Sequence, residues 1–587
     1  MNPSTTTALS LPRRRGWGWA ASTAEQLTGL AALQALYAAL PANLEPGAFL
    51  RTALQRLNVQ AQLASGRLDA VPATGPLVLV CNHPYGAADG LVLADLLLAR
   101  RPDLLLLANH LLRRLPQLAP LILPVDVFHR GASLGGVRAA LRHLEHGGAL
   151  LLFPAGEVSR LDWRARRVTD RPWAESAALL ARRSGAAVVP LCIEGQARWP
   201  SLLAGAVHPR LRTLCLARDL LQQRHSIVRV HLGEAVPAAE LARLTPASQT
   251  AYLRLLSESL AQRPASAASP ASTSVPVAEA EPVERMEQEL AALPSEYLLV
   301  RQADFTVALA EAAQIPVTLR EIGRLRELSF RAVEEGTGTA CDLDAFDADY
   351  QHLYVWHHPT RQLVGAYRLG LTQMLAARRG VAALYTRTLF RYDHALLQHL
   401  GPSIELGRSF VVPAWQRNFR ALRLLWSGIA AVLDARPEIR CLFGPVSISA
   451  SYSPLARALM ETALSTHHSD AVLQRLVSPR TPSRDRASRR DTRPLIAALS
   501  DPALLSRVVS RLDRGSGLPV LLRHYLDLKG RFAGFNVDAD FGDTLDGLVF
   551  VRVADIPAPV RAKFSLARTG TDEPVVAAVT QTGAGAR

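Results

Sequence analysis

The chain has 587 residues, of which 49% are hydrophobic and 20% charged, so it is expected to be mostly globular and to hold more than one domain. Its formal net charge is +15, nearly all of it from arginine, because Lys529 and Lys563 are the only lysines. A basic surface suits nucleic acid, anionic lipid or an acidic carrier protein as partner. The sequence shows no nucleic-acid-binding motif, no metal-binding pattern among its five cysteines and no apolar run of membrane-spanning length. We therefore expect no nucleic acid and no metal.

The first half of the chain alternates short apolar runs with longer amphipathic stretches. The apolar runs predict strands at 77–80, 104–108, 122–127, 149–153, 188–193 and 227–232. The stretches 91–100, 134–145 and 173–184 between them predict helices. This alternation is typical of the α/β fold class, with a sheet layered between helices.

The first predicted strand ends in a turn that carries His83 and, six positions later, Asp89. A histidine oriented by a carboxylate is the arrangement of a general base that takes a proton from a hydroxyl. Asp89 is equally suited to cap the helix that follows it. Both interpretations remain open on these residues.

Three later predicted strands also end in polar residues or glycine. In an open α/β sheet, ligands bind beyond the carboxyl ends of the strands. These ends carry Arg130, Gly156, Glu157 and Arg160. Surface ion pairs are the alternative explanation for the two arginines.

Together, the blocks at 82–89, 124–131, 153–160 and 188–190 resemble the glycerophospholipid acyltransferase family over residues 72–237. The His83–Asp89 spacing is one residue longer than in that family, and Ala155 and Val158 replace its usual acid and threonine, which implies an atypical acceptor. The resemblance implies acyl transfer from a thioester to a lipid hydroxyl, with His83 as base and Asp89 as its orienting partner. It also implies that Arg130 and Arg160 hold an anionic headgroup and that Gly156 and Glu157 shape the acceptor site.

An Ala-, Ser- and Pro-rich stretch at 263–284 reads as a disordered linker. It separates a first domain, residues 1–262, from a second, residues 285–567, and residues 568–587 read as a flexible tail. The second domain is also mixed α/β, with helices predicted at 320–331 and 419–433 and strands at 353–356, 362–369 and 404–411. The pattern of residues 495–564 assigns no role to that region.

The second half carries recurring acids and arginines at the ends of its predicted elements, namely Arg326, Asp344, Asp347, Arg368, Glu405 and Arg408, together with Phe330. Ion pairs that tie strands together are one explanation. The set also resembles N-acyltransferases of the acetyltransferase (GNAT) superfamily over residues 294–464. It is close to acyl-homoserine-lactone synthases and closer to ornithine-lipid N-acyltransferases. The resemblance implies a GNAT-like domain with a central mixed sheet, in which an amine attacks an acyl thioester.

Within that resemblance, Glu405 is the candidate proton acceptor, and Asp344 and Asp347 would hold the ammonium groups of the substrate. Arg368 and Arg408 would shape the site or meet the donor, and Arg326 and Phe330 would belong to the substrate-binding residues. Acetyltransferases hold coenzyme A pyrophosphate in a glycine-rich loop, whereas residues 413–420 contain no glycine. We therefore expect an acyl-carrier-protein thioester as donor and no separate cofactor. Three arginines, Arg417, Arg420 and Arg423, could meet the acidic carrier protein.

The fusion of these two halves resembles the bifunctional ornithine lipid synthases of bacteria. The resemblance implies that the second half transfers a 3-hydroxyacyl group to ornithine or a similar amino acid, and that the first half acylates the new 3-hydroxyl. The basic charge predicts peripheral binding to an anionic membrane, at the cytoplasmic face of the bacterial inner membrane. Two alternatives remain: a glycerophospholipid acyltransferase fused to an N-acyltransferase of another amine, and a haemolysin-like membrane-surface protein with degenerate sites.

Overall fold

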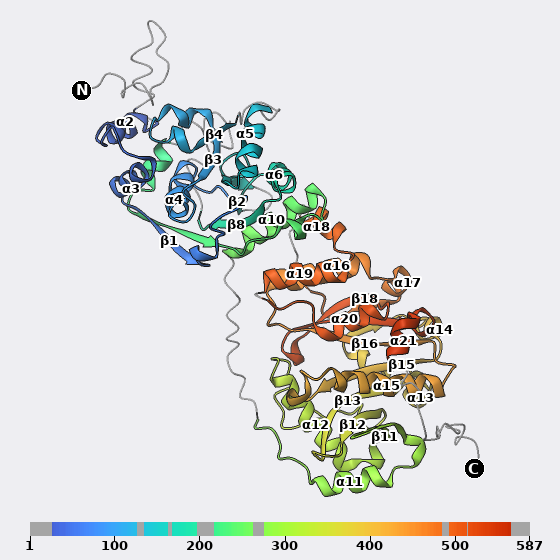
Figure 1. Ribbon diagram of the computed structural model, residues 1–587. Coiled ribbons are helices and arrows are strands. Elements are labelled where there is room, and N and C mark those ends of the chain that lie inside the picture. Colours follow the sequence, from blue (N-terminus) through green and yellow to red (C-terminus); the bar gives the residue numbers. More distant parts are fainter. Residues whose placement is uncertain are drawn as a thin grey trace. The chain divides into compact units, whose positions relative to one another are not determined.

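The structure is a computed structural model that describes residue 26 and residues 28–125, 134–162, 167–195, 217–261, 275–483, 492–513 and 515–564. The chain divides into two compact units (Figure 1). The first comprises residues 1–264 and 488–498, and the second comprises residues 265–487 and 499–587. Each unit is built from a sheet and helices, so the fold is of the predicted mixed α/β class.

The described part of the first unit contains one seven-stranded sheet with β2 in its middle. Its strands in spatial order are β1 (Val59–Ser65), β9 (Ser226–Leu232), β8 (Ala187–Ile193), β2 (Leu77–Cys81), β5 (Ala149–Leu152), β3 (Leu104–Asn109) and β4 (Ile122–Val125). Neighbouring strands run parallel except β8 and β9. Every residue of β2 is buried, because a central parallel strand is covered on both faces. Over the described residues, the apolar runs predicted the other six strands to within two residues, but they did not predict the exposed edge strand β1, whose apolar residues are interrupted by Gln60 and Gln62.

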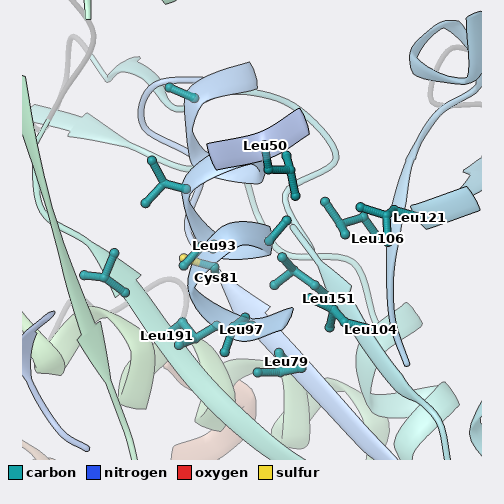
Figure 2. Close-up of a cluster of buried hydrophobic side chains, with 14 of the residues drawn as sticks. Leu50, Leu79, Cys81, Leu93, Leu97, Leu104, Leu106, Leu121, Leu151 and Leu191 are labelled. Carbon is teal, nitrogen blue, oxygen red and sulfur yellow. The ribbon is translucent and has the colours of Figure 1, made fainter. Parts of the chain in front are cut away.

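Helices cover this sheet and form its core with it. They are α2 (Leu30–Ala38), α3 (Pro46–Leu57), α4 (Ala87–Leu98), α5 (Leu134–Glu145), α6 (Ser176–Ser184), α9 (Ala238–Leu241) and α10 (Pro246–Leu260). Figure 2 shows Leu93 and Leu97 of α4 packed over Leu79 and Cys81 of β2, with Leu50 of α3 in the same cluster. A short ribbon of β6 (Arg160–Asp162) and β7 (Arg167–Thr169) follows β5 in the chain.

One helix from the C-terminal part of the sequence also belongs to the first unit. Helix α18 (Arg493–Ala498) packs on α10, where the Ser248 hydroxyl donates to the carbonyl of Pro494 at 2.8 Å. The sequence predicts residues 285–567 as a single second domain, and the structure departs from that expectation at this helix. The contact is between residues 246 positions apart, a separation that no local pattern reveals.

An eight-stranded sheet runs through the described part of the second unit. Its strands in spatial order are β10 (Leu298–Gln302), β11 (Phe305–Glu311), β12 (Gln351–His357), β13 (Gln362–Leu371), β15 (Ser403–Val411), β16 (Cys441–Ile448), β19 (Thr544–Arg552) and β18 (Arg531–Asp538). The parallel neighbours β15 and β16 pair only over residues 403–405 and 441–443. Strands β18 and β19 come from the region to which the sequence assigns no role, and they extend the sheet beyond β16.

Helices lie on both faces of the second sheet. They are α11 (Val283–Ala292), α12 (Pro316–Arg331), α13 (Thr372–Arg379), α14 (Leu396–Leu400), α15 (Phe419–Ala435), α16 (Pro454–His467), α17 (Ala471–Leu476), α19 (Pro502–Leu512), α20 (Val520–Asp527) and α21 (Ala558–Phe564). A small ribbon joins β14 (Phe390–Tyr392) to β17 (Val477–Pro479). Helices α11 and α12 pack on the face that carries Ala308 and Tyr354. Helix α15 covers the other face, where Gly428 lies against Val307 and Leu353.

The stretch before α11 is bound to the second unit. The sequence predicts a disordered linker up to residue 284, but the N–H of Val275 donates to Gly338 (3.0 Å) and that of Ala278 to Ala340 (2.9 Å). Glu281 pairs with Arg320 at 3.0 Å, and α11 starts at Val283. These main-chain bonds need no apolar side chains, so composition gives no sign of them. The rest of the predicted linker and all of the predicted tail lie outside the described residues.

In the described ranges, no helix combines the length and the apolar character that a membrane span requires.

Candidate active sites

Three of the four blocks predicted around His83 meet at one edge of the first sheet. Strand β2 pairs in parallel with β5 on one side and with β8 on the other, so their carboxyl ends lie together. The turn with His83 follows β2, the Gly156–Glu157 turn follows β5, and Glu194 follows β8. Asn82, directly after β2, joins this turn to the end of β8. Its side-chain amide donates to the Ile193 carbonyl at 2.9 Å and accepts from the Ile193 N–H at 2.7 Å. Arg130 lies outside the described residues.

The structure brings His83 and Asp89 together. The Nδ1 atom of His83 lies 2.9 Å from Oδ2 of Asp89, and the aspartate is fully buried while the imidazole is 18% exposed. The same Oδ2 atom accepts hydrogen bonds from the N–H groups of Tyr85 (2.9 Å) and Gly86 (3.0 Å) at the start of α4. Asp89 therefore does both things that the sequence left open: it caps the helix and contacts the histidine. Gly86 adopts a φ of 80°, so this turn accommodates the longer spacing.

This contact leaves the other ring nitrogen of His83 available for chemistry. A carboxylate at Nδ1 favours the tautomer with a proton on Nδ1 and a free lone pair on Nε2. The ring stacks on Phe153 with its centroid 4.1 Å away, which fixes the plane in which Nε2 points. Burial raises the pKa of Asp89, and its contacts with His83 and with the two backbone amides oppose that rise.

A buried aspartate that the sequence did not single out holds the loops of this site together. Asp170 accepts hydrogen bonds from the backbone N–H of His83 (3.3 Å), the hydroxyl of Ser159 and the indole N–H of Trp173 (3.0 Å). The N–H of Ser159 in turn donates to the carbonyl of His83 at 2.8 Å. Asp170 is 87 positions from His83, so no local spacing connects the two.

The remaining residues predicted for this site lie in the turn after β5 and at the start of β6. Gly156 has a φ of 69° in the turn after β5, and Glu157 forms an ion pair with Arg171. Arg160 starts β6, is exposed and forms no ion pair with another described residue. Its guanidinium group is therefore free to meet an anion.

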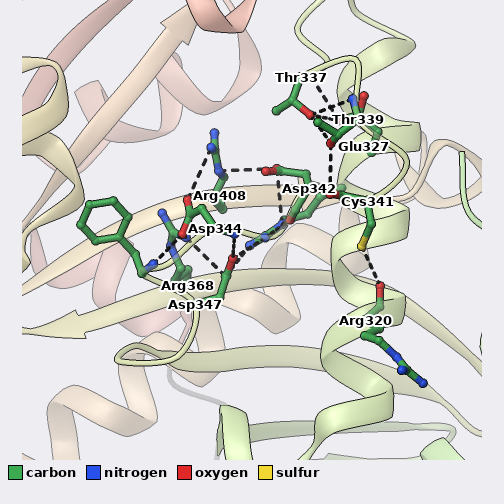
Figure 3. A network of polar contacts seen from close by, with 12 residues as sticks. Arg320, Glu327, Thr337, Thr339, Cys341, Asp342, Asp344, Asp347, Arg368 and Arg408 are labelled. Carbon is green, nitrogen blue, oxygen red and sulfur yellow. Dashed lines mark hydrogen bonds and ion pairs between the residues drawn. The ribbon is translucent and has the colours of Figure 1, made fainter. Parts of the chain in front are cut away.

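The predicted acids and arginines of the second unit other than Glu405 form one network of ion pairs, and Figure 3 labels Asp344, Asp347, Arg368 and Arg408 in it. Arg326 of α12 binds Asp347 through two hydrogen bonds of 3.0 Å, and Arg368 of β13 donates to Asp344 at 2.6 Å. Both arginine side chains are 1% exposed. Burial by itself would raise the pKa of Asp347, but the charges of Arg326 and Arg368 hold it well below its usual range. These ion pairs are the structural explanation that the sequence left open, and they occupy the two acids predicted to hold ammonium groups.

Glu405 of β15 lies in a separate, enclosed set of contacts. One carboxylate oxygen accepts from the N–H (2.7 Å) and hydroxyl (2.5 Å) of Thr386, and the other accepts from the N–H of Tyr385 (3.2 Å) and the hydroxyl of Tyr350. The side chain is 1% exposed, and burial raises its pKa. With four donors already bound, Glu405 is well placed to position the segment at Tyr385–Thr386. To accept a proton from a substrate it would first have to release one of them.

Arg408 differs from Arg326 and Arg368 in its backbone and its contacts. Its φ of 47° is in the left-handed region, which non-glycine residues rarely adopt and which often marks functional positions. Its guanidinium carbon lies 5.0 Å from the ring centroid of Tyr385 and 5.1 Å from that of Phe541. The ion pairs with Asp342 (3.4 Å) and Asp344 (3.7 Å) are long. Phe330 of α12 supports this site by packing edge-on against Phe541 at 5.1 Å.

The three arginines predicted to meet a carrier protein lie at the start of α15. Arg417, Arg420 and Arg423 are exposed and form no ion pair with any described residue. Asn418 caps the helix by accepting from the N–H of Arg420 at 3.0 Å. The described ranges contain no group of three histidine, cysteine or acidic side chains that could hold a metal ion.

Comparison with known proteins finds a different family match within each of the two units. Residues 37–254 match the Acyltransferase family, and residues 325–427 match the acetyltransferase (GNAT) domain family. The chain is therefore an enzyme of the acyltransferase class with two acyltransferase domains. It is 31% identical over 257 residues to the glycine N(alpha)-acyltransferase of Bacteroides thetaiotaomicron, a match that covers 41% of this chain and 75% of that protein. The chain belongs to the same acyltransferase family as that protein.

Two further proteins are similar to parts of the chain. The lyso-glycine lipid O-acyltransferase of Phocaeicola vulgatus is 27% identical over 200 residues, covering 32% of this chain and 68% of that protein. The crystal structure of the 1-acyl-sn-glycerophosphate acyltransferase from Thermotoga maritima matches at 15% identity and a TM-score of 0.23, covering 38% of this chain and 79% of that one.

Proposed function

We propose that the chain makes an amino-acid lipid with two acyl chains. The second unit transfers a 3-hydroxyacyl group from acyl carrier protein to the amino group of an amino acid. The first unit then transfers a second acyl group to the 3-hydroxyl of that product. The observation that carries the proposal is that one chain holds both kinds of domain and has separate relatives named for an N-acylation and for an O-acylation of a lyso-lipid.

In the first unit, the free Nε2 atom of His83 accepts the proton of the substrate hydroxyl as its oxygen attacks the thioester carbonyl carbon. Asp89 at Nδ1 stabilises the imidazolium that forms. The carbon–sulfur bond breaks, and the proton passes from the imidazolium to the departing thiolate. The exposed Arg160 would hold an anionic group of the lipid, and Arg130 is proposed for the same role.

Covalent joining of the two units suits this order of reactions. A singly acylated amino acid is a lipid of low solubility, and linking the second site to the first raises its effective concentration there. The net charge of +15 favours peripheral binding to an anionic membrane surface, where the acceptor lipid would reside. We propose the cytoplasmic face of the bacterial inner membrane as that surface.

Two acceptor amino acids are supported by different observations. Ornithine is the acceptor that the sequence resemblance implies, with Asp344 and Asp347 holding its ammonium groups. In the structure these two acids are bound to Arg368 and Arg326, and one relative of the chain is named for glycine. Glycine is therefore the second candidate.

The proposed function is tested by expressing the full chain in a bacterium that has no aminolipids and comparing its lipids by chromatography and mass spectrometry. We expect a new two-chain lipid whose headgroup mass identifies the amino acid. A strain carrying the empty vector is the control. Absence of any new lipid, with the protein present at normal level in the membrane fraction, would contradict the proposal.

Reversing charge at the start of α15 should weaken use of the carrier protein. In the double variant Arg417→Glu and Arg423→Glu, we expect KM for the acyl carrier protein thioester to rise about tenfold or more while kcat stays within about twofold, because rim charges act on encounter. Arg420 is left in place, since it packs on the ring of Phe305.

The matched control is Arg391→Glu with Arg475→Glu, two exposed arginines on β14 and α17 without a described ion pair. It makes the same change in net charge away from α15. If both double variants raise KM equally, the effect comes from net charge, and the proposed contact at α15 is wrong.

A further inference from the structure

A second polar cluster, of which the sequence singled out only Arg408, lies where the strands β15 and β16 stop pairing. Asp546 on β19 is directly opposite Ser447 on β16, and the serine hydroxyl donates to its Oδ1 atom at 2.6 Å. Arg408 on β15 lies three residues past the last β15–β16 pair. Glu335, in the loop after α12, is partly exposed and electrostatically coupled to Asp546. The cluster therefore gathers groups from three strands and a loop beyond the end of the β15–β16 pairing.

The carboxyl groups of Asp546 and Glu335 in this cluster both have raised pKa values. Asp546 is 3% exposed, and burial raises its pKa to about 7. The charge of Asp538 on β18 adds to that rise, while Arg408 and the hydrogen bond from Ser447 oppose it. Burial and the nearby charge of Asp546 raise the pKa of Glu335 to about 7 as well. A carboxyl group that titrates near neutral pH is suited to exchange a proton with an amine.

Arg408, whose charge acts on Asp546, and its neighbour Arg368 have guanidinium groups that the described residues do not fully pair. Arg368 and Arg408 both lie 5.0 Å from the ring of Tyr385, one on either strand of the β13–β15 pair. The Nε and one terminal nitrogen of Arg368, which is 1% exposed, have no hydrogen-bond partner among the described residues. The Nε of Arg408 also lacks a hydrogen bond there, and its ion pairs are long. Unpaired guanidinium nitrogens in a buried site favour a carboxylate ligand.

We propose that this cluster, the Arg408–Asp546 subsite, binds the acceptor amino acid in its zwitterionic form. Arg408, with Arg368 behind it, binds the carboxylate, and Asp546 faces the amino group and accepts its proton. Glu335 provides a second carboxylate at the more exposed side. The inference rests on the proposed N-acylation and names the residues that select its acceptor.

The chemistry at this subsite balances. The ammonium group gives one proton to the Asp546 carboxylate, and the amine nitrogen forms a bond to the thioester carbonyl carbon. The carbon–sulfur bond breaks, and its electron pair leaves on sulfur. The second proton lost from nitrogen neutralises the thiolate, and Asp546 later releases its proton to solvent. Asp546 has one described donor, Ser447, whereas Glu405 has four, so Asp546 has lone pairs left for a substrate.

Binding of the amino acid tests the subsite without turnover. The full chain is titrated with glycine and with ornithine by calorimetry, as wild type, Asp546→Asn and Arg408→Lys. We expect binding to the wild type and a loss of about tenfold or more in each variant. Glycinamide, which lacks the carboxylate, should bind weakly to the wild type and be little affected by Arg408→Lys. The control is Asp540→Asn, which removes an exposed acid nearby and should bind normally.

Affinity for the amino acid should also fall as the pH drops below about 7, because Asp546 and Glu335 become protonated. In Asp546→Asn this dependence should flatten. The substitution removes a carboxylate that burial disfavours and keeps an acceptor for Ser447, so the variant is expected to be at least as stable as the wild type at pH 8. Loss of binding then cannot be ascribed to unfolding.

The two levels of the account fail separately. Binding by wild type that is unchanged in both variants, or no binding of either amino acid, overturns the Arg408–Asp546 subsite. Binding that depends on Arg408 and Asp546 supports the subsite, whether or not the chain forms an acyl amino acid from a 3-hydroxyacyl carrier protein. Failure to form the acyl amino acid would contradict the proposed function and not the subsite.

Discussion

His83→Ala is expected to stop O-acylation and leave the singly acylated amino acid to accumulate. The variant removes the Nε2 atom that accepts the hydroxyl proton but leaves the second unit unchanged. Loss of a general base lowers a rate by about 10²–10⁴-fold. The measurement is the ratio of one-chain to two-chain lipid in the expressing strain, together with the rate of O-acylation of a supplied lyso-lipid by the purified protein.

A histidine at the other edge of the same sheet provides the control. His146 is exposed in the turn between α5 and β5, so His146→Ala should leave the ratio of the two lipids unchanged. If His83→Ala still makes the two-chain lipid at the wild-type rate, His83 is not the base and the first unit works by another route.

Asp347→Ala is expected to cause the largest loss of stability in the second unit. Asp347 binds Arg326 through two hydrogen bonds and lies 3.3 Å from Arg368, and both arginines are buried. Removing one partner of a buried ion pair leaves the other charge uncompensated, which costs about 3–5 kcal/mol. Chemical denaturation followed by fluorescence measures the free energy of unfolding. The control Asp434→Ala, at an exposed site of α15, should change it by less than about 0.5 kcal/mol.

The pH dependence of stability provides a second readout of the same pair. The pKa of Asp347 is lower in the folded chain than the value of about 3.9 in an unfolded chain. Its contribution to stability is therefore fully present above about pH 4 and is lost as the pH falls further. We expect the stability difference between wild type and Asp347→Ala to shrink on acidification below pH 4. A difference that stays constant over that range would show that Asp347 is not ionised in the folded protein.

The sequence predicted those parts of the fold that have a local signature. Strand β2 and its neighbours are continuous apolar runs, and α5 has an amphipathic period, so their positions follow from pattern. Strand β1 lies on an exposed edge, and Gln60 and Gln62 interrupt its apolar residues. Strands β18 and β19 lie beyond a long intervening region. Neither the presence of these strands nor their place in the sheets was predicted.

The same distinction applies to the sites. His83 and Asp89 lie on one turn, and the sequence brings them together without help from the fold. Asp170 and Asp546 reach their partners only through sheet topology, over separations of 87 and 99 residues to His83 and Ser447. The sequence identified the acids Asp344 and Asp347 and also Arg326 and Arg368, but left open whether the acids bind a substrate or these arginines, because burial decides between the two.

The central claim is that one chain performs two acylations in a fixed order. The most direct measurement supplies the purified full chain with an isotopically labelled amino acid and 3-hydroxyacyl and acyl carrier protein thioesters, and follows labelled products by mass spectrometry over time. We predict that a one-chain lipid forms first and is converted to a two-chain lipid, and that only the first forms in His83→Ala. A two-chain product that contains no amino acid would contradict the account. So would the absence of any labelled lipid product.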